Sequence, residues 1–269
     1  MPIVAAIQMC SVPEVAANCA AAERLIAAAA AAGAELVALP ENWFQMGHAD
    51  TDKLALAEAE GHGPLQDFLA AQARRHGVWV LGGTLPLHGE EPGRVCAASL
   101  LFDARGHIGA RYDKVHLFDV DVDDATGAYR ESATVEPGER IVVADTPCGR
   151  LGFSVCYDLR FPELFRAMSA AGAELFVVPA AFTAVTGRAH WEVLLRARAI
   201  ENLAWVIAPA QSGHHPNGRD TWGDSLIVDP WGEVLARRAA GEGVVLAAID
   251  RERRRTLVRR FPCLDHRRL

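Results

Sequence analysis

The chemistry of this chain is expected to centre on Cys156. This cysteine ends the strand-like run 150–156 and is followed at once by 157–165, which reads as the start of a helix. A side chain at such a junction lies at the rim of a sheet, is held rigidly and can use nearby backbone N–H groups. The position suits a nucleophile, although a lone cysteine in an apolar strand is more often a small buried hydrophobe.

Two charged residues in comparable settings could assist this cysteine. Glu41 follows the apolar run 35–40, and Lys114 leaves a strand predicted over 108–112. Hydrolysis of an unactivated amide needs a strong nucleophile, a base that later protonates the leaving amine, and a cation or N–H donors for the oxyanion. Cysteine, glutamate and lysine supply these functions without a metal. Taken singly, each charged residue is more often a solvated loop residue than a catalyst.

The segments around these residues resemble the nitrilase superfamily of carbon–nitrogen hydrolases, and the resemblance covers nearly the whole chain. The matching patterns are Leu-Pro-Glu-Asn at Glu41, Tyr-x-Lys-x-His-Leu at Lys114 and Val-Cys-Tyr-Asp-x-Arg-Phe-Pro-Glu at Cys156. The resemblance implies that Cys156 attacks the carbonyl and that Glu41 passes its proton to the leaving nitrogen. It implies that Lys114 and the N–H of Tyr157 stabilise the oxyanion. Water then cleaves the thioester, with no cofactor and no metal.

The resting protonation state of the cysteine is left open by the sequence. A nearby ammonium favours the thiolate of Cys156, whereas burial beside Glu41 opposes it. Two classes other than an enzyme also remain. A thiol redox sensor would expose such a cysteine, but it normally shows a resolving partner, and none lies near in sequence. A catalytically silent binding protein commonly loses a member of the catalytic set, and all three members are present here.

Four further residues are candidates for the site. Glu131 resembles the second glutamate that these enzymes place near the lysine and substrate, with a solvated loop carboxylate as the alternative. Arg160 carries a planar fork that suits a substrate carboxylate, or it could anchor the elbow through a nearby carboxylate. Phe182 and Thr186 resemble substrate-binding pocket positions in close relatives, with core packing and helix capping as their alternatives.

The residues after the cysteine favour an amidase, because Tyr157-Asp158 stands where true nitrilases usually carry Trp-Glu. The resemblance is closest to the branch that includes deaminated glutathione amidase, and it is strongest over 182–202, 229–232 and 266–268. The alternative is an ω-amidase acting on 2-oxoglutaramate, or another small-amide hydrolase. Both named substrates share a 2-oxoglutaryl acyl half, which Arg160 would serve alike. The leaving-group contacts are expected in loops 119–130 and 214–220, where no motif separates the two.

Composition limits the partners and the compartment. The 269 residues carry a net charge of -7 with a pI near 5.8, which argues against a nucleic-acid or anionic-membrane surface. No apolar run approaches the ~20 residues that span a bilayer, and the amino terminus lacks signal-peptide features. Most of the six scattered cysteines, which lack metal spacing, are expected to be reduced and buried. A cytoplasmic enzyme with a small-molecule amide substrate is predicted, with helix 190–202 as core or as the interface of a homodimer or higher homo-oligomer.

The predicted fold is α/β, an α-β-β-α sandwich in a single carbon–nitrogen hydrolase domain over 1–269. The segment 31–40 recurs as 170–179: in each, a glycine ends a helix and a buried strand ends in proline. This echo suggests two similar helix–sheet halves packed sheet to sheet, which is also the fold that the resemblance implies. A polar loop is predicted over 119–130, a helix over 189–202, and a polar surface turn at His214-His215.

Overall fold

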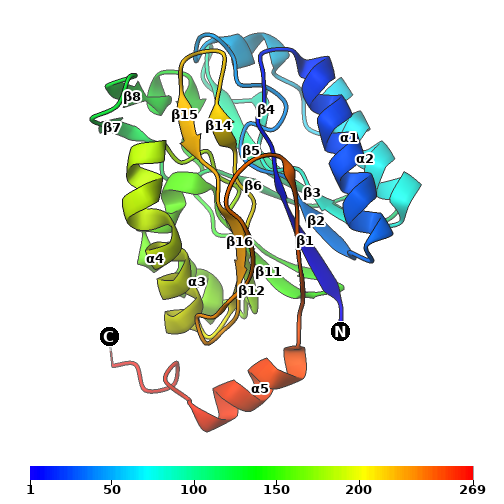
Figure 1. Ribbon diagram of the computed structural model, residues 1–269, viewed down its shortest axis with the longest axis vertical. Coiled ribbons are helices and arrows are strands. Elements are labelled where there is room, and N and C mark those ends of the chain that lie inside the picture. Colours follow the sequence, from blue (N-terminus) through cyan, green and yellow to red (C-terminus); the bar gives the residue numbers. More distant parts are fainter. Residues whose placement is uncertain (269) are drawn as a thin grey trace.

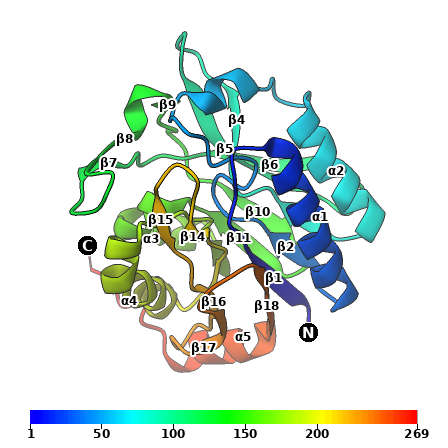
Figure 2. The same cartoon turned by 45° about the horizontal axis from the view of Figure 1, so that its top comes forward.

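The structure is a computed structural model, and it describes residues 1–268. Two β-sheets pack face to face between helices, so the expected α-β-β-α sandwich is confirmed (Figure 1). Helices α1 and α2 cover the outer face of the first sheet, and α3 and α4 cover that of the second (Figures 1 and 2). The helices are α1 (Val15–Ala31), α2 (Pro64–His76), α3 (Pro162–Ala170), α4 (Ala184–Asn202) and α5 (Arg251–Arg260), with short 3₁₀ helices η1 (Asp52–Leu56), η2 (Glu131–Ala133) and η3 (Cys156–Arg160).

Within residues 1–268 the first sheet has eight strands in the order β18-β1-β2-β3-β5-β4, with β6 and β9 paired to β5, and the second has six in the order β10-β11-β12-β13-β16-β17. The first comprises β1 (Ile3–Gln8), β2 (Leu36–Ala38), β3 (Trp79–Leu81), β4 (Leu85–His88), β5 (Val95–Phe102), β6 (Ile108–Asp113), β9 (Val135–Glu136) and β18 (Gly243–Ala248). The second comprises β10 (Val143–Thr146), β11 (Gly149–Phe153), β12 (Leu175–Val177), β13 (Trp205–Ala208), β16 (Ser225–Val228) and β17 (Val234–Arg238).

The repeated segments form β2 and β12, each the middle of three parallel strands. β2 lies between β1 and β3, and β12 lies between β11 and β13. Parallel strands buried on both faces read as continuous apolar runs, which is how both segments read in the sequence. Because the carboxyl ends of parallel strands share one edge of a sheet, the residues that follow β2, β11 and β12 can converge where the two sheets meet.

Helix α1 shows how the outer layers are held. Its alanine-rich sequence has high helix propensity, and its buried residues recur at helical spacing, from Ala22 through Leu25 and Ile26 to Ala29. Burying a leucine or isoleucine in this way contributes about 1.5–3 kcal/mol. The helix ends before Gly33, whose φ of 87° is a left-handed conformation that glycine adopts without strain.

Three local predictions are wrong. The segment 119–130, predicted as a loop, is a β-hairpin of β7 (Asp119–Asp121) and β8 (Ala128–Arg130). Antiparallel backbone pairing of these two strands orders the segment despite its polar sequence. Helix α4 starts at Ala184 because the Thr183 hydroxyl caps it by accepting from the Thr186 N–H. A second hairpin, β14 (Ser212–His214) and β15 (Asp220–Trp222), replaces the predicted surface turn.

His215 is fully buried, contrary to the surface position predicted for it. One ring nitrogen lies 2.8 Å from the carbonyl oxygen of Ser11, and the other lies 2.7 Å from the hydroxyl of Thr221. Both ring nitrogens therefore have a hydrogen-bond partner, so burial of the ring leaves neither of them unpaired. Across residues 1–268, no helix has the length and apolar character needed to cross a membrane.

Candidate active site

Cys156 lies at the start of η3, directly after the segment that leaves β11. Its φ of 48° is a left-handed conformation that is unusual for a residue other than glycine. Its N–H donates to the Pro179 carbonyl past the end of β12 at 2.8 Å, which holds the turn in this conformation. Such strain is kept where surrounding contacts determine it, as at a nucleophile. Tyr157 follows in the first turn of η3, where N–H groups lack intrahelical partners.

The Asp158 carboxylate holds the turn at Cys156 through several hydrogen bonds. It is fully buried, and it accepts hydrogen bonds from the Val155 N–H at 2.8 Å and the Tyr112 hydroxyl at 2.7 Å. It also accepts from the His116 N–H at 3.0 Å and lies 2.7 Å from His116 Nδ1. Burial and then the Asp158 charge raise the pKa of Tyr112, so its hydroxyl remains a donor. Asp158 thus ties the Cys156 turn to the segment that carries Lys114, a role that the sequence did not reveal.

Glu41 reaches the same point from the carboxyl end of β2. Its Oε1 accepts from Lys114 Nζ at 2.8 Å, and its Oε2 accepts from the Ala181 N–H at 2.9 Å. The next residue, Asn42, has a φ of 54°, and its N–H donates to the Thr84 hydroxyl at 2.9 Å. Glu41 is 4% exposed, so it is not the solvated loop residue of the alternative interpretation.

Lys114 is shared between two carboxylates. Besides Glu41, its Nζ lies 2.9 and 2.8 Å from the two oxygens of Glu131. Glu131 also accepts from the Phe118 N–H at 2.7 Å, which orients its carboxylate toward the lysine. The Lys114 side chain is 1% exposed and that of Glu131 is 16% exposed. The structure therefore places Glu131 beside Lys114, as the resemblance implied.

The charges around Cys156 decide its resting state. Burial alone would raise the pKa of Glu41, but the charge and hydrogen bond of Lys114 outweigh it and lower that pKa below its ordinary value. Burial would likewise lower the pKa of Lys114, but Glu131 and Glu41 raise it well above its ordinary value. Burial and then the Glu41 charge raise the pKa of Cys156 well above that of a free thiol, despite Lys114. At neutral pH the group holds a thiol, a carboxylate and an ammonium.

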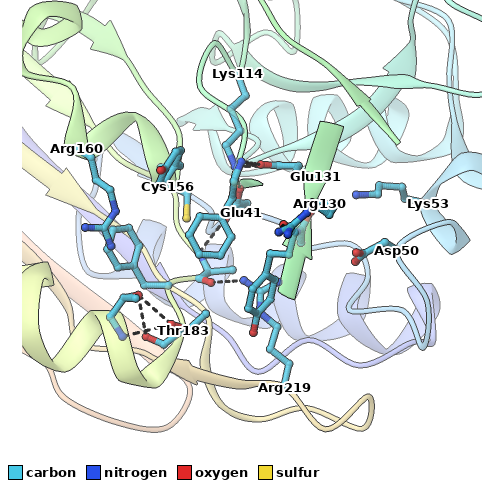
Figure 3. Close-up of a pocket in the computed structure, with 17 residues that line it drawn as sticks. Glu41, Asp50, Lys53, Lys114, Arg130, Glu131, Cys156, Arg160, Thr183 and Arg219 are labelled. Atoms are coloured by element: carbon cyan, nitrogen blue, oxygen red, sulfur yellow. Dashed lines mark hydrogen bonds and ion pairs between the residues drawn. The ribbon is translucent and has the colours of Figure 1, made fainter. Parts of the chain in front are cut away.

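A cavity of about 590 Å³ opens above these side chains (Figure 3). Phe182 and Thr186 line it, as does Arg160. Thr186 is bonded to the capping Thr183, so it belongs both to the cavity wall and to the start of α4. Phe182 lines the cavity and also packs on Trp191 of α4, with ring centroids 4.9 Å apart.

The Arg160 guanidinium is free to meet a substrate. It lies over the rings of Tyr157 and Phe182, 5.7 and 5.3 Å from their centroids, and its Nη1 is 3.2 Å from His190 Nδ1. Among residues 1–268 no carboxylate pairs with it, so the structure gives no support to anchoring of the elbow through a nearby carboxylate.

Two cavity residues, Lys53 and Arg219, were missed as individual candidates, although Arg219 falls in a segment expected to contact the leaving group. One signal was present for Lys53. Of the 27 basic residues in the sequence only Lys53 and Lys114 are lysines, and both line this cavity. Arg219 had no comparable signal, because its position depends on how the β14–β15 hairpin folds over the site.

The arrangement can support attack of sulfur on a carbonyl. A carboxylate in contact with the thiol can accept its proton, and a fixed ammonium with a free backbone N–H can stabilise an oxyanion. Residues 1–268 contain no group of three His, Cys, Asp or Glu side chains placed to hold a metal ion.

Comparison with known proteins agrees with this chemistry. Residues 3–259 match the carbon–nitrogen hydrolase family. The chain is 46% identical over 266 residues to a deaminated glutathione amidase of Yersinia enterocolitica, covering 98% of this chain and 92% of that protein. It is 40% identical over 272 residues to a human deaminated glutathione amidase, covering 100% of this chain and 83% of that protein. The crystal structure of the Caenorhabditis elegans NitFhit protein superposes with a TM-score of 0.90 at 38% identity, covering 99% of this chain and 65% of that one. The chain therefore belongs to the carbon–nitrogen hydrolase family, and it is a hydrolase of the amidase class.

Proposed function

We propose that this amidase hydrolyses deaminated glutathione to 2-oxoglutarate and cysteinylglycine, using Cys156, Glu41 and Lys114. The observation that carries the proposal is the position of Glu41, which contacts both the Cys156 thiol and the Lys114 ammonium on the floor of the cavity. The similarity to enzymes of that name in bacteria and in humans supports the choice of substrate.

The reaction begins with attack of Cys156 Sγ on the amide carbonyl while Glu41 takes the thiol proton. The oxyanion forms beside Lys114 and the Tyr157 N–H, which are charged or polarised before the reaction starts and need no reorganisation. Glu41 then gives its proton to the leaving nitrogen, the C–N bond breaks and a thioester remains. Glu41 next accepts a proton from water as it attacks the thioester, and the acid product leaves with regeneration of the thiol.

The acyl half is expected to be oriented by Arg160. Its guanidinium has no carboxylate partner in the described part of the chain and faces the cavity, so a bidentate contact to the 2-oxo acid carboxylate would satisfy it. Phe182 and Thr186 would line the pocket beside that half, and Glu131 would hold Lys114 in place.

The enzyme is further proposed to act as a homodimer in the cytoplasm. Val193 and Ile200 on α4 are 68% and 48% exposed, and Trp231 on the adjoining turn is 59% exposed. The Arg196 guanidinium ties the two elements together through the Gly232 carbonyl at 2.8 Å, so the face is continuous. The six cysteines are free thiols, which fits a reducing compartment. Light scattering of the purified protein tests the dimer, and a monomeric mass would contradict it.

Release of 2-oxoglutarate tests the function. The purified protein is incubated with deaminated glutathione and, in parallel, with 2-oxoglutaramate, and the product is measured from each. A higher kcat/KM for deaminated glutathione is expected, with no release by the Cys156→Ala variant. A higher kcat/KM for 2-oxoglutaramate would refute the substrate, and release by the alanine variant would refute the nucleophile.

A further inference from the structure

The active-site cavity continues into a second one. The outer cavity has a volume of about 370 Å³, and both cavities are lined by Asn42, Asp50, Lys53 and Arg219. The outer cavity lies between the loop that follows β2 and the β14–β15 hairpin. The Asn217 side-chain amide at the hairpin tip donates to the Gly47 carbonyl at 2.8 Å, so the two walls are bonded to each other. The outer cavity is therefore formed before any ligand binds.

Lys53 stands at the junction of the two cavities. Figure 3 shows its ammonium directed into the cavity, on the other side of Cys156 from Arg160. Across residues 1–268 this ammonium makes no hydrogen bond and no ion pair. Burial lowers the pKa of Lys53, although the charges of Glu131 and Asp50 act against the shift. A partly buried cation without a partner costs folding free energy, and a bound anion would remove that cost.

Arg219 is the second cation at the junction. Its Nη2 donates to the Ala181 carbonyl at 2.6 Å, and its guanidinium lies 5.2 Å from the centroid of the Tyr129 ring. Its Nε is buried without a hydrogen-bond partner. In the described part of the chain no carboxylate forms an ion pair with Arg219, although its charge acts on Glu41 from a distance.

The inner cavity has an excess of positive charge although the protein as a whole is acidic. Five cationic and three anionic side chains line it within residues 1–268, against a net charge of -7 for the chain. Two of the three carboxylates, Glu41 and Glu131, are already bonded to Lys114. The remaining field favours an anionic ligand.

We propose that the leaving group occupies the outer cavity and that Lys53 and Arg219 bind a carboxylate at its far end. This inference rests on the proposed function, because cysteinylglycine is the leaving group of deaminated glutathione. Its terminal carboxylate lies two residues beyond the scissile nitrogen, about 7 Å away when extended. The substrate would then be held by one carboxylate at Arg160 and by the other at Lys53 and Arg219, with the scissile bond between them. The leaving group of 2-oxoglutaramate is ammonia, which carries no carboxylate, so that substrate makes no contact with this site.

A matched pair of substrates tests the proposal. Deaminated glutathione is compared with its derivative in which the glycine carboxylate is a carboxamide, using the wild type and the Lys53→Met variant. The wild type is expected to prefer the carboxylate by about ten- to a hundredfold in kcat/KM, chiefly through KM. The Lys53→Met variant should lose most of that preference, with a larger loss of kcat/KM on the carboxylate than on the carboxamide or 2-oxoglutaramate. Arg219→Gln should also reduce the preference.

Two controls separate recognition from support of the fold. Arg105 is exposed in the β5–β6 turn and lines neither cavity, so Arg105→Gln should leave the preference unchanged. The Lys53→Met variant should melt no lower than the wild type, since methionine keeps the length of the side chain and removes a cation that burial disfavours. A residue that merely supports the cavity would melt lower when replaced.

The outcomes are distinct. Equal losses on all three substrates, or a lower melting temperature for Lys53→Met, would show a structural role and overturn the proposal. Equal hydrolysis of the carboxylate and carboxamide by the wild type would overturn this inference alone. A wild type that hydrolyses neither would overturn the proposed function together with it.

Discussion

The Lys114 ammonium donates to Glu41 Oε1 at 2.8 Å, and the Glu41 carboxylate and the Cys156 thiol act on each other's pKa. Glu41 stays ionised because Lys114 lowers its pKa, and its charge helps to keep Cys156 protonated. Glu41 can therefore accept the Cys156 proton as sulfur attacks, so the nucleophile need not exist as a thiolate before the substrate binds.

Glu41→Gln should slow substrate turnover but speed alkylation of the Cys156 thiol. The amide can still accept from the Ala181 N–H, but it cannot take a proton, so kcat should fall by about 10²–10⁴. Removing the Glu41 charge should also lower the pKa of Cys156, because that charge raises it in the wild type. Iodoacetamide should then alkylate Cys156 faster than in the wild type at pH 7, with the midpoint of the rate profile at lower pH. Slower alkylation together with lost turnover would show that the substitution disrupts the site.

Lys114→Met should destabilise the protein as well as inactivate it. The substitution leaves Glu41 and Glu131 close together and buried without a counter-charge, and breaking such a pair costs about 3–5 kcal/mol. Glu131→Gln should be milder, because Lys114 keeps Glu41, and it should lower kcat with a smaller loss of stability. Urea unfolding compares the free energies of unfolding. Equal stability of Lys114→Met and wild type would contradict a charged network at this site.

Asp158→Asn should loosen the nucleophile turn without touching the substrate. An amide nitrogen in place of Oδ2 would face both the Tyr112 hydroxyl and the Val155 N–H, which donate to that oxygen, and in place of Oδ1 it would face the His116 N–H. Replacing hydrogen bonds to a charged group costs about 1.5–3 kcal/mol each. Tyr112→Phe is the matched control, since it removes one of these bonds and leaves the carboxylate. We expect a lower free energy of unfolding and a lower kcat for Asp158→Asn, with a smaller stability loss for the control. An unchanged kcat would mean that the turn holds its shape alone.

Arg160→Ala should lower kcat/KM by about ten- to a hundredfold for both deaminated glutathione and 2-oxoglutaramate, because both present the same acyl carboxylate. Arg160→Lys should recover only part of this, since an ammonium cannot reproduce the planar fork. An amide with a neutral acyl group should be much less affected. If that neutral amide lost as much, Arg160 would be supporting the turn through its contacts with Tyr157 and Phe182.

The sequence located residues at strand ends better than residues brought in by loops. Glu41 and Cys156 follow apolar runs that are buried strands, so their place at the sheet edge followed from the pattern. Lys53 and Arg219 lie on a 3₁₀ helix and a hairpin, and only the packing of those elements brings them to one cavity. His215 was misjudged because a polar dipeptide beside a turn gives no sign that Ser11 and Thr221 will satisfy its ring.

Trapping of the acyl-enzyme tests the central claim most directly. The protein is mixed with deaminated glutathione, quenched in acid during turnover, and digested for mass spectrometry. A 2-oxoglutaryl adduct is expected on Cys156, and Cys148, another buried thiol whose pKa burial raises to about 12, serves as the internal control. The adduct should disappear in Cys156→Ala, along with turnover. An adduct on any other residue, or turnover by Cys156→Ala, would contradict the account.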